Sequence, residues 1–171
     1  AGNLTSSELK ALKPYVASIG IMLESGDKRL LARDGAHYGS PDKIPVRRMT
    51  TLARAGRLGI PVTTGLLIGI GESVAQRLED MITLTRLHAR YGHIQEVIIQ
   101  NFRAKTGTKM AHAEEVSTDE LLRTVALARL LLPSSVSVQV PPNLNSAHLA
   151  SLLSAGINDW GGISPVTPDH V

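Results

Sequence analysis

The chain has 171 residues, of which 43% are hydrophobic, 3% aromatic and 19% charged, enough for one domain with an aliphatic core. A formal net charge of +3 gives no indication of nucleic-acid or membrane-surface binding. No apolar run approaches the ~18 residues of a membrane span. The absence of cysteine excludes disulfides and thiolate metal sites, and makes the cytoplasm the default location.

Apolar runs alternate with amphipathic segments along the chain at a spacing of roughly 30 residues. In chain order, the pattern predicts a short helix between Thr5 and Pro14, a strand at 16–23, a basic helix at 46–58, a strand at 60–70, a helix at 73–90, a strand at 94–101, a helix at 117–132, a strand at 136–140, a helix at 146–154 and a strand at 157–163. Thr5 with Glu8, and Ser117 with Glu120, have the spacing of capping boxes.

Strands that alternate with helices are typically parallel and joined by right-handed crossovers. The predicted fold class is therefore α/β: a parallel barrel of TIM type, incomplete, with about five βα units in a single domain over 1–171. The polar stretch 25–45 exceeds the usual connection length, which makes it a candidate functional loop. Within it, His37 and Tyr38 are interpreted as exposed loop residues.

Functional side chains of a barrel gather at the carboxyl ends of its strands. Each predicted strand is followed by polar or glycine-rich residues: Glu24, Gly69 to Glu72, Gln100 with Asn101, Gln139 to Asn143, and Asp159 to Gly162. A polar residue between Val138 and Val140 should face the barrel interior or solvent, which singles out Gln139. The recurrence predicts a ligand site at one edge of the sheet; ordinary loop composition is the alternative explanation.

Several kinds of site are excluded or disfavoured. Gly69 and Gly71 begin a G-x-G pattern, but Val74 occupies the third position of the dinucleotide fingerprint. No P-loop occurs, and the histidines lack metal-ligand spacing, so no metal ligand is expected. The arginines of the basic helix are expected to form a solvated outer face: Arg47, Arg48, Arg54 and Arg57.

The segment from Gly65 to Glu72 resembles the fifth-strand G-x-I-x-G-x-x-E motif of radical S-adenosylmethionine enzymes. The resemblance continues through four further segments and so covers nearly the whole chain: 20–25, 97–105, 138–145 and 155–162. Taken together, the chain resembles the C-terminal part of the barrel in the radical S-adenosylmethionine half of deazaflavin (FO) synthases, which are biotin-synthase-like.

The resemblance implies a parent enzyme that uses an iron–sulfur (4Fe-4S) cluster to cleave S-adenosylmethionine reductively. The resulting deoxyadenosyl radical would abstract hydrogen from an adduct of tyrosine and ribitylaminouracil, and cyclisation with loss of ammonia would give the deazaflavin FO chromophore. The implied partners are the small-molecule substrate, the missing N-terminal portion of the barrel and the companion FO synthase half, with no nucleic acid and no membrane.

Cluster ligation needs thiolates, and this sequence has none. Two interpretations remain open: a fragment that begins after the third barrel strand, or a non-catalytic module that binds a nucleoside or a partner protein. We prefer the fragment because the remaining strand ends are intact, and we expect it to be inactive alone. A cluster-free barrel enzyme such as an aldolase would need a catalytic lysine or acid–base pair that is not evident.

The same resemblance implies roles for individual residues, none of them catalytic. The candidates for the adenosyl cofactor wall are Glu24, Ile68, Gly69, Ile70, Gly71, Glu72, Gln100 and Asn101. The candidates for substrate binding are Gln139, Asn143 and Arg103. The Glu24 carboxylate would accept hydrogen bonds from ribose hydroxyls, and the glycines would let the backbone approach adenine. The alternative for Glu24 is a solvated acid at a strand end, for Glu72 the helix dipole alone, and for Arg103 a loop cation. For the glycines, Gln100 and Asn101 it is turn chemistry at a strand end.

Overall fold

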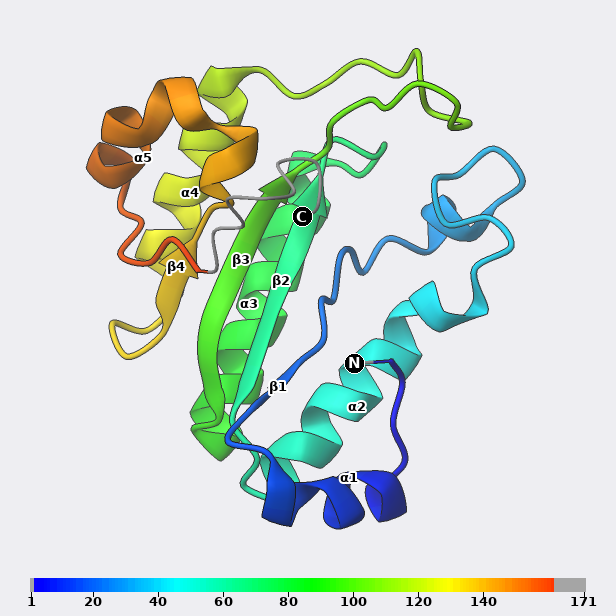
Figure 1. The fold of residues 1–171 in the computed structure, drawn as a ribbon, viewed down its shortest axis with the longest axis vertical. Helices are drawn as coiled ribbons and strands as arrows, with labels where there is room; N and C mark the ends of the chain where they lie inside the picture. Colours follow the sequence, from blue (N-terminus) through cyan, green and yellow to red (C-terminus); the bar gives the residue numbers. More distant parts are fainter. Residues whose placement is uncertain (1, 162–171) are drawn as a thin grey trace.

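The computed structural model describes residues 2–161, which form a parallel sheet of four strands in the order β1-β2-β3-β4 (Figure 1). The strands are β1 (Ile19–Gly20), β2 (Val62–Ile68), β3 (Ile94–Asn101) and β4 (Ser137–Gln139). The helices are α1 (Ser6–Leu12), α2 (Pro45–Arg57), α3 (Val74–Tyr91), α4 (Thr118–Leu131) and α5 (Leu149–Ala155). Short 3-10 helices are η1 (Lys13–Tyr15), η2 (Lys28–Leu31), η3 (Pro41–Lys43), η4 (Pro142–Leu144) and η5 (Ser146–His148).

Each strand pair is parallel and each strand is followed by a helix, so the predicted α/β class with parallel strands is confirmed. The four described strands form an open sheet, which is compatible with part of a TIM-type barrel. Within residues 2–161, none of the helices combines the length and the apolar character needed to cross a bilayer.

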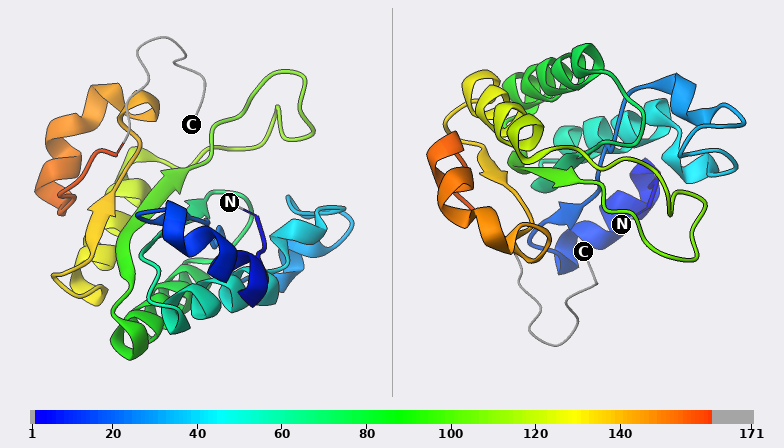
Figure 2. Two further views of the ribbon diagram at one scale, coloured as in Figure 1. Left: turned by 60° about the horizontal axis from the view of Figure 1, so that its bottom comes forward. Right: turned by 90° about the horizontal axis from the view of Figure 1, so that it is seen from above.

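Helices α2, α3 and α4 lie along one face of this sheet (Figure 2). Side chains alternate along a strand, so one set from β2 points into the helix-covered core, where Val62, Leu66 and Ile68 are at most 1% exposed. The alternate residues, such as Thr63 and Leu67, are only partly buried. We call the side of the sheet that carries Thr63 and Leu67 the open face.

Most predicted elements lie within two residues of their expected bounds, and β3 coincides with the predicted strand at 94–101. The first capping box is present: the Thr5 hydroxyl accepts the Glu8 N–H, and the Glu8 carboxylate accepts the Thr5 N–H. The second is only half formed, because the Ser117 hydroxyl accepts the N–H of Glu120 at 3.2 Å while the Glu120 carboxylate binds elsewhere.

The first and last predicted strands are shorter than expected. The strand expected at 16–23 pairs regularly only at β1 and again at a bridge between Glu24 and Leu66. From the Ile19–Val62 pair to that bridge, the β1 side advances by five residues and the β2 side by four, so one extra residue is accommodated as in a bulge. The strand expected at 157–163 is represented by a single bridge from Asp159 to Gln139, and its last two residues lie outside the described part.

Truncating a core residue of α4 tests the packing of the helix layer. Leu121 is 2% exposed and Leu130 is 81% exposed, on the same helix. Leu121→Ala should lower the free energy of unfolding by about 2–5 kcal/mol, because it removes buried methyl groups and leaves a cavity. Leu130→Ala, the matched control, should change it by less than about 0.5 kcal/mol. Denaturant titration of both variants measures this difference, and equal losses would contradict the arrangement.

Candidate functional site

Glu24 lies where β1 meets the long loop, and its backbone is left-handed, with φ 65°. It is the one non-glycine residue with positive φ in the described part of the chain. Two hydrogen bonds to β2 hold it: its N–H donates to the Gly65 carbonyl, and its carbonyl accepts the Leu67 N–H, both at 2.9 Å. Such a conformation costs about 1–3 kcal/mol and persists where the surroundings over-determine it, often at functional sites.

Lys43, Arg48 and His37 converge on the Glu24 carboxylate. Lys43 Nζ and Arg48 Nη1 donate to Oε1, the latter at 3.1 Å, and His37 Nε2 lies 3.1 Å from Oε2. Burial by itself would raise the pKa of Glu24. The hydrogen bonds from His37 and Lys43 and the charges of Arg48 and Lys43 outweigh it and hold the pKa at about 2. We call these four residues the Glu24 cluster.

Two members of the cluster correct expectations from the sequence. His37 was expected to be an exposed loop residue and Arg48 to be solvated on the outer face of its helix, yet each is 6% exposed. Tyr38, in contrast, is 52% exposed, as expected. A carboxylate buried at a strand end requires cationic or hydrogen-bonding partners, so the position of Glu24 was the available signal for them.

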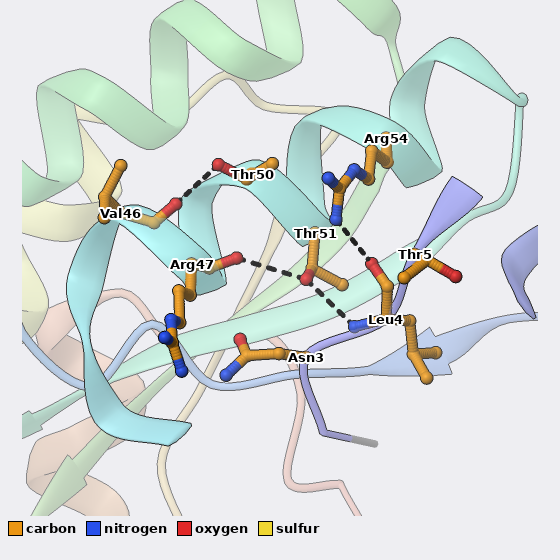
Figure 3. Close-up of a pocket in the computed structure, with 8 residues that line it drawn as sticks. All are labelled: Asn3, Leu4, Thr5, Val46, Arg47, Thr50, Thr51 and Arg54. Atoms are coloured by element: carbon orange, nitrogen blue, oxygen red, sulfur yellow. Dashed lines mark hydrogen bonds between the residues drawn. The ribbon is translucent and has the colours of Figure 1, made fainter. Parts of the chain in front are cut away.

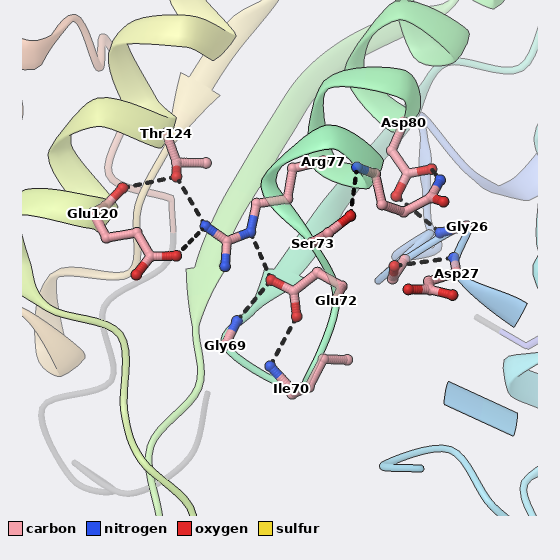
Figure 4. A network of polar contacts seen from close by, with 12 residues as sticks. Gly26, Asp27, Gly69, Ile70, Glu72, Ser73, Arg77, Asp80, Glu120 and Thr124 are labelled. Carbon is pink, nitrogen blue, oxygen red and sulfur yellow. Dashed lines mark hydrogen bonds and ion pairs between the residues drawn. The ribbon is translucent and has the colours of Figure 1, made fainter. Parts of the chain in front are cut away.

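The Glu72 side chain binds the backbone of the glycine-rich turn after β2. Gly69 and Gly71 have φ of 90° and 105°, which glycine adopts without strain. The Glu72 carboxylate accepts the N–H groups of Gly69 at 2.8 Å and Ile70 at 2.9 Å (Figure 4). Arg77 Nε binds the same carboxylate at 2.6 Å. Glu72 therefore fixes the shape of the turn from within the protein.

Arg77 extends this network to the next helix. Its Nη1 lies 2.6 Å from the Glu120 carboxylate of α4, which explains why Glu120 does not complete its capping box. The same atom is 3.4 Å from the Thr124 hydroxyl (Figure 4). Through Arg77, the turn after β2 is tied to both α3 and α4.

The two isoleucines of this segment differ in position. The Ile68 side chain is fully buried in the helix-covered core, so it can support the strand end but does not reach the open face. Ile70 is 5% exposed and lines a cavity of about 330 Å³ between two loops. The remaining residues that line it are Arg33, Asp34, Gly35, Ala36, Tyr38, Lys109 and Met110.

At the end of β3 the predicted residues have different environments. Gln100 lies on the open face in register with Leu67, and its side chain makes no hydrogen bond to any residue in 2–161. Asn101 is 3% exposed, and its Oδ1 accepts a hydrogen bond from Asn145 Nδ2 at 2.8 Å. Arg103 binds the Glu115 carboxylate and the Leu144 carbonyl, each at 2.6 Å. Asn101 and Arg103 thus connect β3 with the segment after β4.

Gln139 lies on β4 in register with Ile98, and so faces the same side of the sheet as Gln100. It is 7% exposed, because Trp160 and Gly161 cover it, and its Nε2 donates to the Trp160 carbonyl at 3.2 Å. Asn143 follows in η4 and is partly buried.

A cavity of about 300 Å³ joins the Glu24 cluster to the open face. It is lined by Gly20, Ile21, Met22, Glu24, Lys43, Arg48, Thr63 and Ile98. Its strand residues Thr63 and Ile98 lie before the ends of β2 and β3. The register places Leu67 beside Gln100 and Ile98 beside Gln139 on the same side of the sheet. The structure therefore collects cations, amides and a glycine turn along one side of the sheet, an arrangement suited to binding a polar ligand.

A second cavity, of about 350 Å³, lies between the N-terminal segment and α2 (Figure 3). The hydroxyls of Thr50 and Thr51 donate to the carbonyls of Val46 and Arg47 in their own helix, and Arg54 donates to the Leu4 carbonyl. No strand end lines this cavity. We therefore place the candidate site at the strand ends.

The groups available to a metal are few. Within residues 2–161, no three His, Cys, Asp or Glu side chains are grouped so as to hold a metal ion. The whole sequence lacks cysteine, so the chain has no thiolate with which to ligate an iron–sulfur cluster.

Comparison with known proteins confirms the resemblance found in the sequence. The chain is 50% identical over 172 residues to FO synthase of Mycobacterium tuberculosis, covering 99% of the chain and 20% of that protein. It is 53% identical over 171 residues to 7,8-didemethyl-8-hydroxy-5-deazariboflavin synthase of Methanosarcina acetivorans, covering 100% of the chain and 50% of that protein. The enzyme of the same name from Methanopyrus kandleri is 50% identical, with 51% of its length covered.

No family model matches the chain. The chain spans from a fifth to about half the length of these curated relatives, and so corresponds to a part of them.

The depressed pKa of Glu24 has a consequence for stability. The pKa falls from an ordinary value of 4.5 to about 2, so the ionised cluster stabilises the fold fully above pH ~4.5 and loses this contribution as the pH falls towards 2. At pH 7, Glu24→Gln should lower the free energy of unfolding by about 3 kcal/mol. This difference from the unaltered chain should shrink as the pH falls from about 4.5 towards 2. Denaturant titrations at pH values from about 2.5 to 7 measure this difference. The control is Glu79→Gln, at an exposed glutamate. A gap that stays constant with pH would contradict the ion pairing.

Proposed function

We propose that this chain forms the adenosyl and substrate wall of a radical S-adenosylmethionine FO synthase. The observation that carries the proposal is about 50% identity to FO synthases over nearly the whole chain. The proposed reaction of the parent enzyme is formation of the deazaflavin chromophore from the tyrosine–ribitylaminouracil adduct with loss of ammonia, a lyase reaction of deazaflavin biosynthesis in the cytoplasm. The chain alone would be inactive.

The strand-end surface suits an adenosyl ligand. Gly69 and Gly71 present backbone without side chains, and Gln100 offers an amide with no hydrogen-bond partner among the described residues. S-adenosylmethionine, when bound, would supply the radical chemistry of the reaction. The residues of this chain would bind the adenosyl group, orient it towards the substrate and exclude water from it.

The iron–sulfur cluster does not fit this chain, because no thiolate is present to hold it. In the proposed enzyme its ligands belong to the missing N-terminal portion of the barrel, which would be the principal partner of this segment. The companion FO synthase half is a second proposed partner. The relatives are two to five times as long as the region that they share with this chain. This difference in length supports the division of the enzyme into this segment and further portions.

Within the site, direct contacts and positioning roles can be separated. Glu24, Ile70, Gly69, Gly71 and Gln100 are the proposed contacts to the cofactor. Glu72, Asn101 and Ile68 would act as positioning residues, since their side chains are buried and those of Glu72 and Asn101 already bind other parts of the protein. Gln139, Asn143 and Arg103 are the proposed substrate-binding residues, whose amides and guanidinium suit uracil and carboxylate oxygens.

Gln100 gives the clearest test of this proposal, because its side chain makes no hydrogen bond that a substitution would remove from the fold. The experiment uses a complete FO synthase that contains this segment, reconstituted with iron and sulfide. Gln100→Ala should reduce formation of 5′-deoxyadenosine from S-adenosylmethionine by about tenfold, the value of one lost hydrogen bond to ligand. The exposed Gln95→Ala, on the same strand, is the matched control.

Thermal unfolding of both variants should match that of the unaltered synthase. A Gln100→Ala enzyme with full activity would reject this site assignment. A well-loaded cluster that yields no 5′-deoxyadenosine in the unaltered synthase would reject the proposed function itself.

A further inference from the structure

Glu96 places a carboxylate on the open face of the sheet, well before the strand ends. It lies on β3 and pairs with Thr63 of β2 and Ser137 of β4. Ile98 and Gln100 follow it on the same side of β3, because side chains alternate along a strand. At about 3.3 Å per residue, Glu96 lies about 13 Å from Gln100 along the strand, away from the strand ends.

One oxygen of the Glu96 carboxylate has no partner. The Thr63 hydroxyl donates a hydrogen bond to Oε2 at 3.1 Å. Oε1 is shielded from solvent, and no residue in 2–161 donates a hydrogen bond to it. Because nearly every buried polar atom of a native protein has a partner, Oε1 requires a donor from outside this part of the chain.

The charge of Glu96 is also without compensation. Burial raises the pKa of Glu96, the negative charge of Asp159 raises it further, and the Thr63 hydrogen bond alone opposes them. Glu24 and Glu72, in contrast, each form an ion pair with an arginine. An ionised Glu96 therefore lowers the stability of the fold, and a side chain that opposes folding in this way is typical of a functional site.

The chemistry of a carboxylate restricts the group that it can bind. An ionised carboxylate only accepts hydrogen bonds, so the partner of Glu96 must be a donor. In the proposed reaction the ribityl chain of the adduct is the richest source of donors, since all but one of its carbons carry a hydroxyl. The deazariboflavin product keeps this chain, so the chain can lie far from the cofactor. Binding of such a remote group orients the reacting end of the substrate.

We propose that Glu96 is a substrate-binding residue that accepts hydrogen bonds from the ribityl hydroxyls of the adduct. The inference rests on the proposed function and names the group by which this site selects its substrate. Thr63 acts as a positioning residue, because its hydroxyl holds Oε2 of the carboxylate. Gln139 lies between Glu96 and the strand ends, in register with Ile98, where its amide suits the uracil ring to which the ribityl chain is attached.

Equilibrium binding to a complete synthase that contains this segment tests the assignment with two probes. One is the product, the deazaflavin FO, and the other is its counterpart with a methyl group in place of the ribityl chain. In Glu96→Leu, fluorescence titration should show FO bound about 10- to 100-fold more weakly, the value of hydrogen bonds to a charged group. The affinity for the methyl counterpart should not change.

Two further variants complete the experiment. Glu96→Gln keeps one acceptor oxygen, so it should show a smaller loss with the same selectivity for FO. Its thermal unfolding at pH 7 should occur at the temperature of the unaltered synthase or above it, because the amide has no charge to desolvate. Glu79→Gln, the same substitution at an exposed glutamate of α3, should change neither affinity.

Equal weakening of both probes, or no change in either, overturns the inference while leaving the proposed function intact. A clear loss of stability in Glu96→Gln also overturns it, because the partner of Glu96 would then be a cation from the N-terminal portion of the barrel. An unaltered synthase that forms no FO from the adduct overturns the proposed function, and the inference with it.

Discussion

The arrangement of the site depends on one buried carboxylate. Glu24 lies at the end of β1, 9% exposed and with left-handed backbone, where an ionised group requires partners to offset its desolvation. His37 and Lys43 come from the long loop and Arg48 from α2, so satisfying Glu24 draws both elements over the strand end. The same three contacts place the Lys43 ammonium beside the cavity on the open face. A constraint of folding thus produces the chemical character of the cavity.

A second polar network fixes the neighbouring strand end. Glu72 holds the glycine turn after β2, and Arg77 connects it to Glu120 on α4. The two networks sit at the ends of adjacent strands, and β3 and β4 extend the row with Gln100 and Gln139. Buried charges that are held by several hydrogen bonds make a rigid frame, and binding of a reactive cofactor requires such a frame.

The sequence predicted the features that depend on local pattern. The run from Ile94 to Asn101 and the amphipathic segment that becomes α3 have the length and periodicity that identify a strand and a helix, and both are found there. The order of polar strand ends also followed from the sequence alone. The motif from Gly65 to Glu72 and its flanking segments identified the relatives, as the comparisons confirm.

What the sequence did not predict depends on contacts between distant residues. His37 and Arg48 approach Glu24 from 13 and 24 positions away, and no local pattern indicates that they turn inward. The irregular pairing of β1 arises from a register shift against β2, which periodicity cannot reveal. Nor could spacing show that Glu120 would bind Arg77 instead of completing its capping box.

The strand ends, and not the cavity on α2, form the proposed cofactor wall. A crystal structure of a complete FO synthase with S-adenosylmethionine bound tests it most directly. We expect the adenosyl group to lie against the backbone of Gly69 to Gly71, within hydrogen-bond distance of the Gln100 amide. An adenosyl group bound away from these strand ends, with Gln100 left without a ligand contact, would contradict it.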